Sequence, residues 1–312
     1  MKFIPLQITT ISPSKTITFD LYIYFKETYL KYQEAGTLIP TDKLEKLTKQ
    51  KVAKFYIDDE DIHMYQTYIQ ELMNEKLEDQ DLGIEQKVAV VEGACLTAVE
   101  QSFKNPDSEK SYEMTEVAAQ KLKKVLETGP DALKEFFEKK TIDTDLVIAH
   151  SMNVASLATR LAIRVGCSDK EISNISTAAL LHDVGLTRLN KQDQELFKKH
   201  KEDMNDDEQR IYGLHVKDAI SALKDRPWVK KGVLELIVNH EEVLTGKGPN
   251  KLKNLTLPIM ILSLVNTYDK HVTISGMNPR DALMEITVKH IDDFEHDIIN
   301  KFKDILIDEG VI

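Results

Sequence analysis

Short apolar segments with rough alternation characterise the first 75 residues. The segments FIPLQITTI (3–11), TITFDLYIYF (16–25) and VAKFYI (52–57) are rich in Ile, Thr, Tyr and Phe, a composition typical of β-strands. Segments 40–50 and 58–77 are predicted helices, because each opens with Thr or Asp residues that can cap a first turn. We therefore expect a small α+β domain over residues 1–75. It has one histidine, His63, and no Gly-rich phosphate loop, so regulation, dimerisation or packing is its expected role.

From residue 76 onward, apolar residues recur at intervals of three and four, the period of an amphipathic helix. Residues 76–140 are predicted to form connecting helices, and Gly129-Pro130 ends one of them, since proline cannot continue a helix. Further helices are expected within 143–166, 169–185, 207–225, 227–242, 257–272 and 278–291. The predicted fold class is mainly α, with an all-helical bundle over residues 141–312 and the small α+β domain before it.

Four of the nine histidines continue the apolar stripe of a predicted helix: His150, His182, His215 and His240. Helical spacing of this kind turns a side chain toward the core. A local hydrogen bond explains one buried histidine, but four on successive helices point to one shared partner. A metal cation accepts neutral imidazole nitrogens and relieves their desolvation cost. The other five lie in polar surroundings and are interpreted as ordinary: His63, His200, His271, His290 and His296.

Carboxylates accompany these four histidines. Asp183 follows His182, Glu241 follows His240, and Asp269 shares a predicted helix face with Asn266. Together these groups exceed the four ligands of a structural zinc site, which favours a dinuclear centre with a bridging carboxylate. The two cysteines show no ligand spacing, so iron or manganese suits this nitrogen- and oxygen-rich set as well as or better than zinc. Paired metals of this kind serve phosphoester hydrolysis.

At these positions the sequence resembles the HD domain superfamily, and within it the HD-GYP branch of bacterial phosphodiesterases that act on the second messenger cyclic di-GMP. The resemblance runs from about residue 140 to 290. It is carried by His150-Ser151, LLHDVG (180–185), His215, IVNHEEVLTGKGP (237–249) and IMILSLVNTYD (259–269). It implies an HD-type helical bundle and a metal-dependent phosphodiesterase activity.

Carried over residue by residue, the resemblance implies a set of metal ligands. These are His150, His182, the bridging Asp183, His215 and His240, with Glu241 in place of a second histidine and Asn266 and Asp269 at the two later aspartate positions. Asn266 would bind a metal weakly through its carbonyl oxygen. Asp269 would either bind the metal in its place or orient another ligand by a hydrogen bond. Leu146 occupies the place of a glutamate that belongs to a third metal site, so two divalent metal ions are expected.

The sequence departs from the family pattern at two positions that matter for activity. Leu186 replaces the lysine of the HDxGK motif, and Pro249 stands where the tyrosine of GYP is expected. The resemblance assigns catalysis to Asp183 and His182, and Lys191 is the candidate replacement for the missing lysine. The expected phosphate-binding side chains are Arg188, Lys247 and Lys251.

Charge and composition limit the partners. Lys and Arg total 41 and Asp and Glu total 52, which gives a net charge of −11 and argues against a nucleic-acid polymer or an anionic membrane. The most apolar run, 257–265, is about half the ~18 residues that span a bilayer. The start of the sequence is too polar for a signal peptide, and a cytoplasmic location is expected. A homodimer or a signalling protein partner is an open alternative.

Three functions fit these observations. The first is a dinuclear phosphodiesterase that hydrolyses cyclic di-GMP. The second is an HD phosphohydrolase of another nucleotide or phosphoester, which the missing lysine and tyrosine favour. The third is a weakly active or inactive metal-bound module that binds cyclic di-GMP or a partner protein and signals through residues 1–75.

Overall fold

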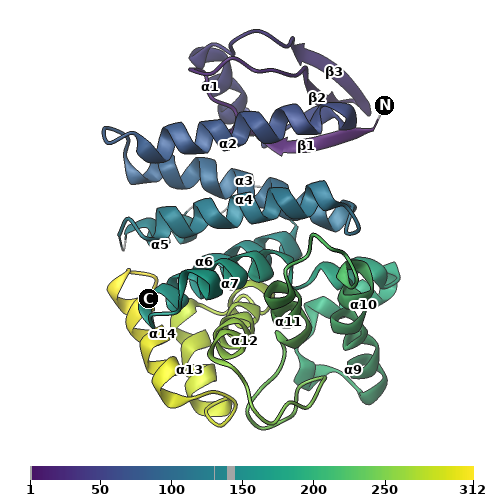
Figure 1. The fold of residues 1–312 in the computed structure, drawn as a ribbon, viewed down its shortest axis with the longest axis vertical. Coiled ribbons are helices and arrows are strands. Elements are labelled where there is room, and N and C mark those ends of the chain that lie inside the picture. The colour runs from purple at the N-terminus through teal and green to yellow at the C-terminus, as the bar shows by residue number, and fades with distance from the viewer. Residues whose placement is uncertain (1, 130, 139–144) are drawn as a thin grey trace.

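A computed structural model describes residues 2–129, 131–138 and 145–312. The described part is mainly helical, with one small sheet near the N-terminus, as the sequence predicts. In Figure 1 the sheet and helix α1 lie at one end, helices α2, α3 and α4 cross the middle, and the C-terminal helices form the other end.

The sheet has four antiparallel strands in the order β1-β4-β2-β3. Their bounds are β1 (Phe3–Gln7), β2 (Leu21–Phe25), β3 (Thr28–Gln33) and β4 (Lys54–Asp58). Strand β3 was not predicted. The turn before it places Lys26 and Glu27 at φ 48° and 61°, and the sequence lacks the Asn-Gly or Asp-Gly pair that usually marks such a hairpin.

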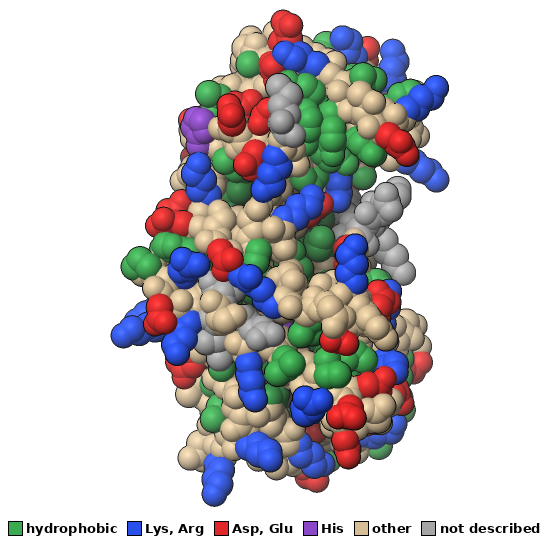
Figure 2. All heavy atoms as spheres, turned by 90° about the vertical axis from the view of Figure 1, so that its right-hand side faces the viewer, with side chains coloured by type: hydrophobic (Ala, Val, Ile, Leu, Met, Phe, Trp, Pro, Cys, Tyr) green, Lys and Arg blue, Asp and Glu red, His purple; other side chains and the backbone are tan. Residues whose placement is uncertain are grey.

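One face of the sheet packs onto the helices and the other carries aromatic side chains. Leu6, Phe55 and Ile57 are fully buried, whereas the rings of Tyr24, Tyr29 and Tyr56 contact one another on the opposite face. Figure 2 shows hydrophobic side chains gathered over this end of the molecule, with both signs of charge interspersed elsewhere on that face.

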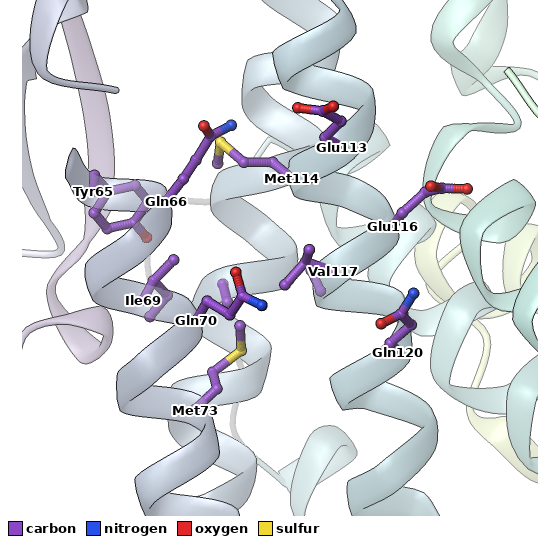
Figure 3. Close-up of a pocket in the computed structure, with 12 residues that line it drawn as sticks. Tyr65, Gln66, Ile69, Gln70, Met73, Glu113, Met114, Glu116, Val117 and Gln120 are labelled. Atoms are coloured by element: carbon purple, nitrogen blue, oxygen red, sulfur yellow. The ribbon is translucent and has the colours of Figure 1, made fainter. Parts of the chain in front are cut away.

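The middle layer joins the two ends. After α1 (Thr41–Lys49), which lies beside the sheet, it contains α2 (Ile62–Glu78), α3 (Ile84–Lys104), α4 (Glu109–Leu126) and α5 (Asp131–Glu138). Helix α2 runs through the predicted boundary at residue 75, and one apolar core continues from Ile4 to Leu306. A cavity of about 330 Å³ lies between α2 and α4 (Figure 3), and none of the predicted site residues lines it.

The C-terminal half is a helical bundle centred on α6 (Leu146–Arg164). Around it lie α7 (Asp169–Leu181), α8 (Lys191–Gln194), α9 (Asp206–Tyr212), α10 (Leu214–Leu223), α11 (Lys231–Asn239), α12 (Leu257–Asp269), α13 (Pro279–Lys289) and α14 (His296–Asp308). Segment 207–225 was predicted as one helix, but Gly213 separates α9 from α10. Helix α6 is long and apolar enough to cross a membrane by composition, yet 61% of its most apolar window is buried inside the protein. It contacts α3, α4, α7 and α12, as the central helix of a packed bundle does.

Candidate metal centre

Four helices bring the predicted histidines to one point in the C-terminal bundle. His150 lies in α6 and His215 in α10, while His182 and His240 directly follow the last residues of α7 and α11. All four side chains and Asp183 have no exposed surface. The structure therefore gathers groups that are up to 90 residues apart in the chain, which is the convergence the sequence predicted.

Three of the histidines are oriented by the backbone. The Nδ1–H groups of His182, His215 and His240 donate to the carbonyl oxygens three residues earlier, at 2.7, 2.5 and 2.7 Å. A carbonyl oxygen only accepts a hydrogen bond, so each Nδ1 carries the proton and each Nε2 keeps its lone pair. This tautomer is the one that binds a metal through Nε2.

The Nε2 atoms surround Asp183 in two pairs. Oδ2 of Asp183 lies 3.2 Å from Nε2 of His182 and 3.7 Å from that of His150. Oδ1 lies 3.4 Å from Nε2 of His215 and 3.6 Å from that of His240. Within each pair the Nε2 atoms are 3.1 and 3.3 Å apart. Each oxygen of this carboxylate therefore faces two imidazole nitrogens.

This arrangement fits two cations that share Asp183. Neither Asp183 oxygen accepts a hydrogen bond from any residue that the structure describes, and a buried carboxylate without donors is costly. Lone pairs of the surrounding Nε2 atoms also point at one another, which is unfavourable unless a cation lies between them. The two groups of potential ligands are His150, His182 and Asp183, and Asp183, His215 and His240.

Asp269 and Asn266 occupy different sides of His150. Asp269 accepts from Nδ1 of His150 at 2.7 Å and also from Asn153 and Thr273. Because His150 donates from Nδ1, its Nε2 is the free nitrogen, and Oδ1 of Asn266 lies 2.9 Å from it. Asn266 thus stands with the ligand atoms, whereas Asp269 holds His150 from behind. The sequence had left this choice open.

Glu241 lies at the edge of the second group and is paired with a lysine. Its Oε1 is 3.9 Å from Nε2 of His215 and 2.8 Å from Nζ of Lys270. Lys270 also donates to the hydroxyl of Tyr212 at 2.7 Å. Sequence reasoning missed Lys270, although it follows Asn266 by four residues and so shares its helix face.

Burial and neighbouring charges set the protonation of the centre. Burial lowers the pKa of His240 to about 3, so its ring is neutral at neutral pH. Burial opposes ionisation of Asp183, but His182, Lys270 and His215 hold its pKa well below the ordinary value. Burial also disfavours the charged forms of Glu241 and Lys270; their mutual attraction outweighs it, lowering the pKa of Glu241 and raising that of Lys270.

A cleft of about 450 Å³ opens beside this centre. Glu241, Asn266 and Lys270 line its inner part, and its walls carry Lys199, Lys201, Lys247, Lys289, His200, His271 and His290. The sequence had placed these last three histidines in polar surroundings and outside the site. His271 is only 7% exposed, and its ring stacks on that of His200 with 4.6 Å between centroids. They were missed because they come from three separated segments of the chain.

Three of the predicted cations do not line this cleft. Arg188 is paired with Asp107 at 2.5 Å, Lys191 is exposed at the start of α8, and Lys251 is exposed in the loop after Gly248. Lys247 does line the cleft. Leu186, at the position of the motif lysine, is 3% exposed in an apolar cluster with Phe197, Met204 and Tyr212, so no charge reaches the cleft from that position.

The loop that carries Lys247 is held by Glu242. This buried carboxylate accepts from the backbone N–H groups of Asn250 at 2.6 Å and Leu252 at 2.8 Å. A side chain at Gly248 would come within 2.5 Å of the same carboxylate. The second glutamate of HEEVLTGKGP therefore shapes the loop, while the first lies at the centre.

Comparisons with known proteins relate this chain to others by family and by fold. Residues 139–292 match the family model of the HD domain. The solved structure of Bd1817, a HDG"Y"P protein from Bdellovibrio bacteriovorus, is similar over 98% of this chain and 100% of that one, with a TM-score of 0.76 and 23% identity. The HD domain of the L. monocytogenes phosphodiesterase PgpH in complex with cyclic-di-AMP covers 60% of this chain and 93% of that one at a TM-score of 0.35 and 17% identity. Among curated protein sequences no significant match is found.

The HD motif, the family match and the shared fold lead to one assignment. Residues 139–292 form an HD domain, and the chain as a whole has the fold of an HDGYP protein.

Proposed function

We propose that this protein is a phosphodiesterase of the HD-GYP type that uses two divalent cations and acts on a cyclic dinucleotide, cyclic di-GMP being the first candidate. The observation that carries the proposal is Asp183, whose two oxygens each face a pair of imidazole nitrogens and accept no hydrogen bond within the described residues. Its position between the two pairs is that of a bridging ligand.

The residues present would hold one cation with His150, His182 and Asp183, and another with Asp183, His215 and His240. Asn266 adds an oxygen near His150, and Glu241 adds one near His215. When bound, such cations supply Lewis-acid charge for phosphorus oxygens and make water a nucleophile at neutral pH. Iron or manganese suits the ligand set, with zinc as the alternative.

The chain itself prepares the site for this chemistry. Backbone carbonyls fix three imidazoles in the tautomer that leaves Nε2 free, and burial keeps His240 neutral. Asp269 fixes the ring of His150 in the same way through Nδ1. No proton has to leave these imidazoles before a cation binds, which favours occupancy at neutral pH.

The cleft favours a substrate with more than one negative charge. Five lysines line it, from four separate regions of the C-terminal half, at Lys199, Lys201, Lys247, Lys270 and Lys289. The cleft also carries Glu202, Glu241 and Asp293, so its lysines outnumber its carboxylates by five to three, whereas the protein as a whole carries a net charge of −11. A cyclic dinucleotide presents two phosphodiesters to such a surface.

The test is to remove metals with a chelator, reload the protein with Fe²⁺, Mn²⁺ or Zn²⁺, and measure metal content and cleavage together. We expect about two cations per chain and hydrolysis of cyclic di-GMP faster than that of cyclic di-AMP or bis(p-nitrophenyl) phosphate. A protein that retains no metal overturns the proposal. Cleavage of the generic ester alone replaces it with the broader phosphohydrolase.

A second candidate is a module that binds the cyclic dinucleotide without cleaving it. The apolar environment of Leu186 favours this alternative, because the cleft lacks the motif lysine at that position. Tight binding of cyclic di-GMP by the metal-loaded protein, with no product after prolonged incubation, would select the binding module over the hydrolase.

A further inference from the structure

We propose that Lys270 is a phosphate-binding residue of this site, a role that neither the HD motif nor the sequence pattern assigns to it. The inference rests on the proposed function, since it places the phosphate of the substrate beside the centre. It depends on three observations: where Lys270 lies, what its ammonium group already contacts, and which other cations surround the cleft.

Lys270 is part of the inner wall of the cleft. It is the first residue of the π-helical turn Lys270–Ile274 that follows α12, and its side chain is 16% exposed. Nζ of Lys270 lies 2.8 Å from Oε1 of Glu241, and the same oxygen lies 3.9 Å from Nε2 of His215. A positive charge therefore lies one carboxylate oxygen away from the ligand atoms.

The ammonium group has donor capacity to spare. Among the residues that the structure describes, the partners of Nζ are Oη of Tyr212 at 2.7 Å and Oε1 of Glu241 at 2.8 Å. An ammonium has three N–H groups, so one is left for a ligand in the cleft. A phosphoryl oxygen is a strong acceptor for such a donor, and the charge-assisted bond is about twice as strong as a neutral one.

Lys270 also offsets the negative charge of Glu241 at the inner end of the cleft. The Glu241 carboxylate would repel a phosphate placed beside the centre, and Lys270 neutralises it. Glu241 therefore still offers an oxygen to a cation, while Lys270 offsets most of the repulsion between the Glu241 carboxylate and a phosphate. Tyr212 fixes the position of Nζ, and the same Tyr212 packs in the apolar cluster that encloses Leu186.

The other cleft lysines are less suited to this role. Lys199 is paired with Glu208 at 2.6 Å and Lys289 with Glu285 at 2.5 Å, and their side chains are 47% and 57% exposed. Water screens exposed charges, so their contribution to holding a phosphate is small. The side chain of Lys270, at 16% exposed, is better shielded from water than these two, and we assign to it the contact with a phosphoryl oxygen.

The experiment compares Lys270→Met, Lys270→Arg and, as a control away from the cleft, Lys303→Met, which changes an exposed lysine on α14. Each protein is loaded with Mn²⁺, its metal content is determined, and its affinity for inorganic phosphate is measured by calorimetry. We expect Lys270→Met to keep its metal and to bind phosphate about 10- to 100-fold more weakly. Lys270→Arg should recover most of that affinity, and Lys303→Met should resemble the unmodified protein.

Two results would overturn the inference. One is a Lys270→Met variant that binds phosphate as tightly as the unmodified protein. The other is loss of metal from that variant, which would make Lys270 a support for Glu241 only. If Lys270→Met does not fold, Tyr212→Phe tests the same point, because it frees Nζ from one anchor and should weaken phosphate binding severalfold. A different result would reject the proposed function alone: the protein hydrolyses no ester, but it still binds phosphate, and the Lys270→Met substitution weakens that binding.

Discussion

The two halves of the candidate centre are built from similar imidazoles but supported differently. In the first half His150 and His182 share Oδ2 of Asp183, and Asp269 holds His150 from behind through Nδ1. In the second half His215 and His240 share Oδ1, both rings are held by backbone carbonyls, and the nearby Glu241 is paired with Lys270 at the cleft.

The two halves differ in where their additional carboxylate lies. The first half has a carboxylate behind its histidine, which raises the basicity of the imidazole and strengthens metal binding. The second half uses its carboxylate at the cleft wall, where a lysine neutralises it. We therefore expect the cation of the first half to bind more tightly, and that of the second half to lie nearer the substrate.

The largest effect is expected from Asp183→Asn, because this residue belongs to both halves. Loss of the bridging charge should remove both cations and lower hydrolysis by more than about 1000-fold, since the metals supply several kcal/mol of transition-state stabilisation. Metal content and hydrolysis rate are the measurements. Asp304→Asn, an exposed carboxylate on α14, is the control and should behave as the unmodified protein; metal retained by Asp183→Asn contradicts the bridging role.

Removing one histidine from each half should separate the two cations. His182→Ala and His240→Ala should each reduce the metal content from about two to about one per chain. Titration with a chelator then compares the remaining cation in each variant. We expect His240→Ala to keep the tighter one, and the reverse order would show that the support from Asp269 is not decisive.

Asp269→Asn tests the support of the first half directly. An amide still fills the space but accepts less strongly from Nδ1 of His150, so affinity for the first cation should fall about 10- to 100-fold. Chelator competition measures this affinity, and the second cation should bind as before. Equal weakening of both cations would indicate a general disturbance of the fold.

Acid should destabilise the metal-free protein because the buried histidines resist protonation. The pKa of His240 is lowered to about 3 and that of His271 to about 4, from an ordinary value of 6.5. Below pH 6.5 the unfolded chain takes up protons that the folded chain does not, so stability falls as the pH falls toward 4. Thermal unfolding between pH 7 and 4.5 measures this slope, and a His271→Asn variant should show a shallower one.

The smallest effect is expected from Gly248→Ala in the loop that carries Lys247 to the cleft. The new Cβ would meet the Glu242 carboxylate at 2.5 Å, a clash that should cost about 1–3 kcal/mol of stability and leave the metal content unchanged. Chemical denaturation gives the stability. Gly83→Ala is the matched control, because nothing lies within 4 Å of its added Cβ.

Much of the site could be predicted because histidine is conspicuous on an apolar helix face. The spacing of His150, His182, His215 and His240 predicted their burial, and all four are buried. Lys270 was missed for the converse reason: it lies near the end of the helix predicted over 257–272, where a lysine is expected to face solvent. Arg188 was assigned to phosphate from its position near His182, yet its guanidinium pairs with Asp107 from another segment of the chain.

The sequence by itself determined the helical bundle, the small N-terminal sheet and the identity of the converging histidines, because periodicity and residue type are local properties. Only the tertiary structure decided that Asp269 lies behind His150 while Asn266 stands with the ligand atoms, and that Lys270 rather than Lys191 reaches the cleft. These outcomes depend on how separate helices pack against one another. The spacing of residues within one helix does not determine which side chains of another helix they contact.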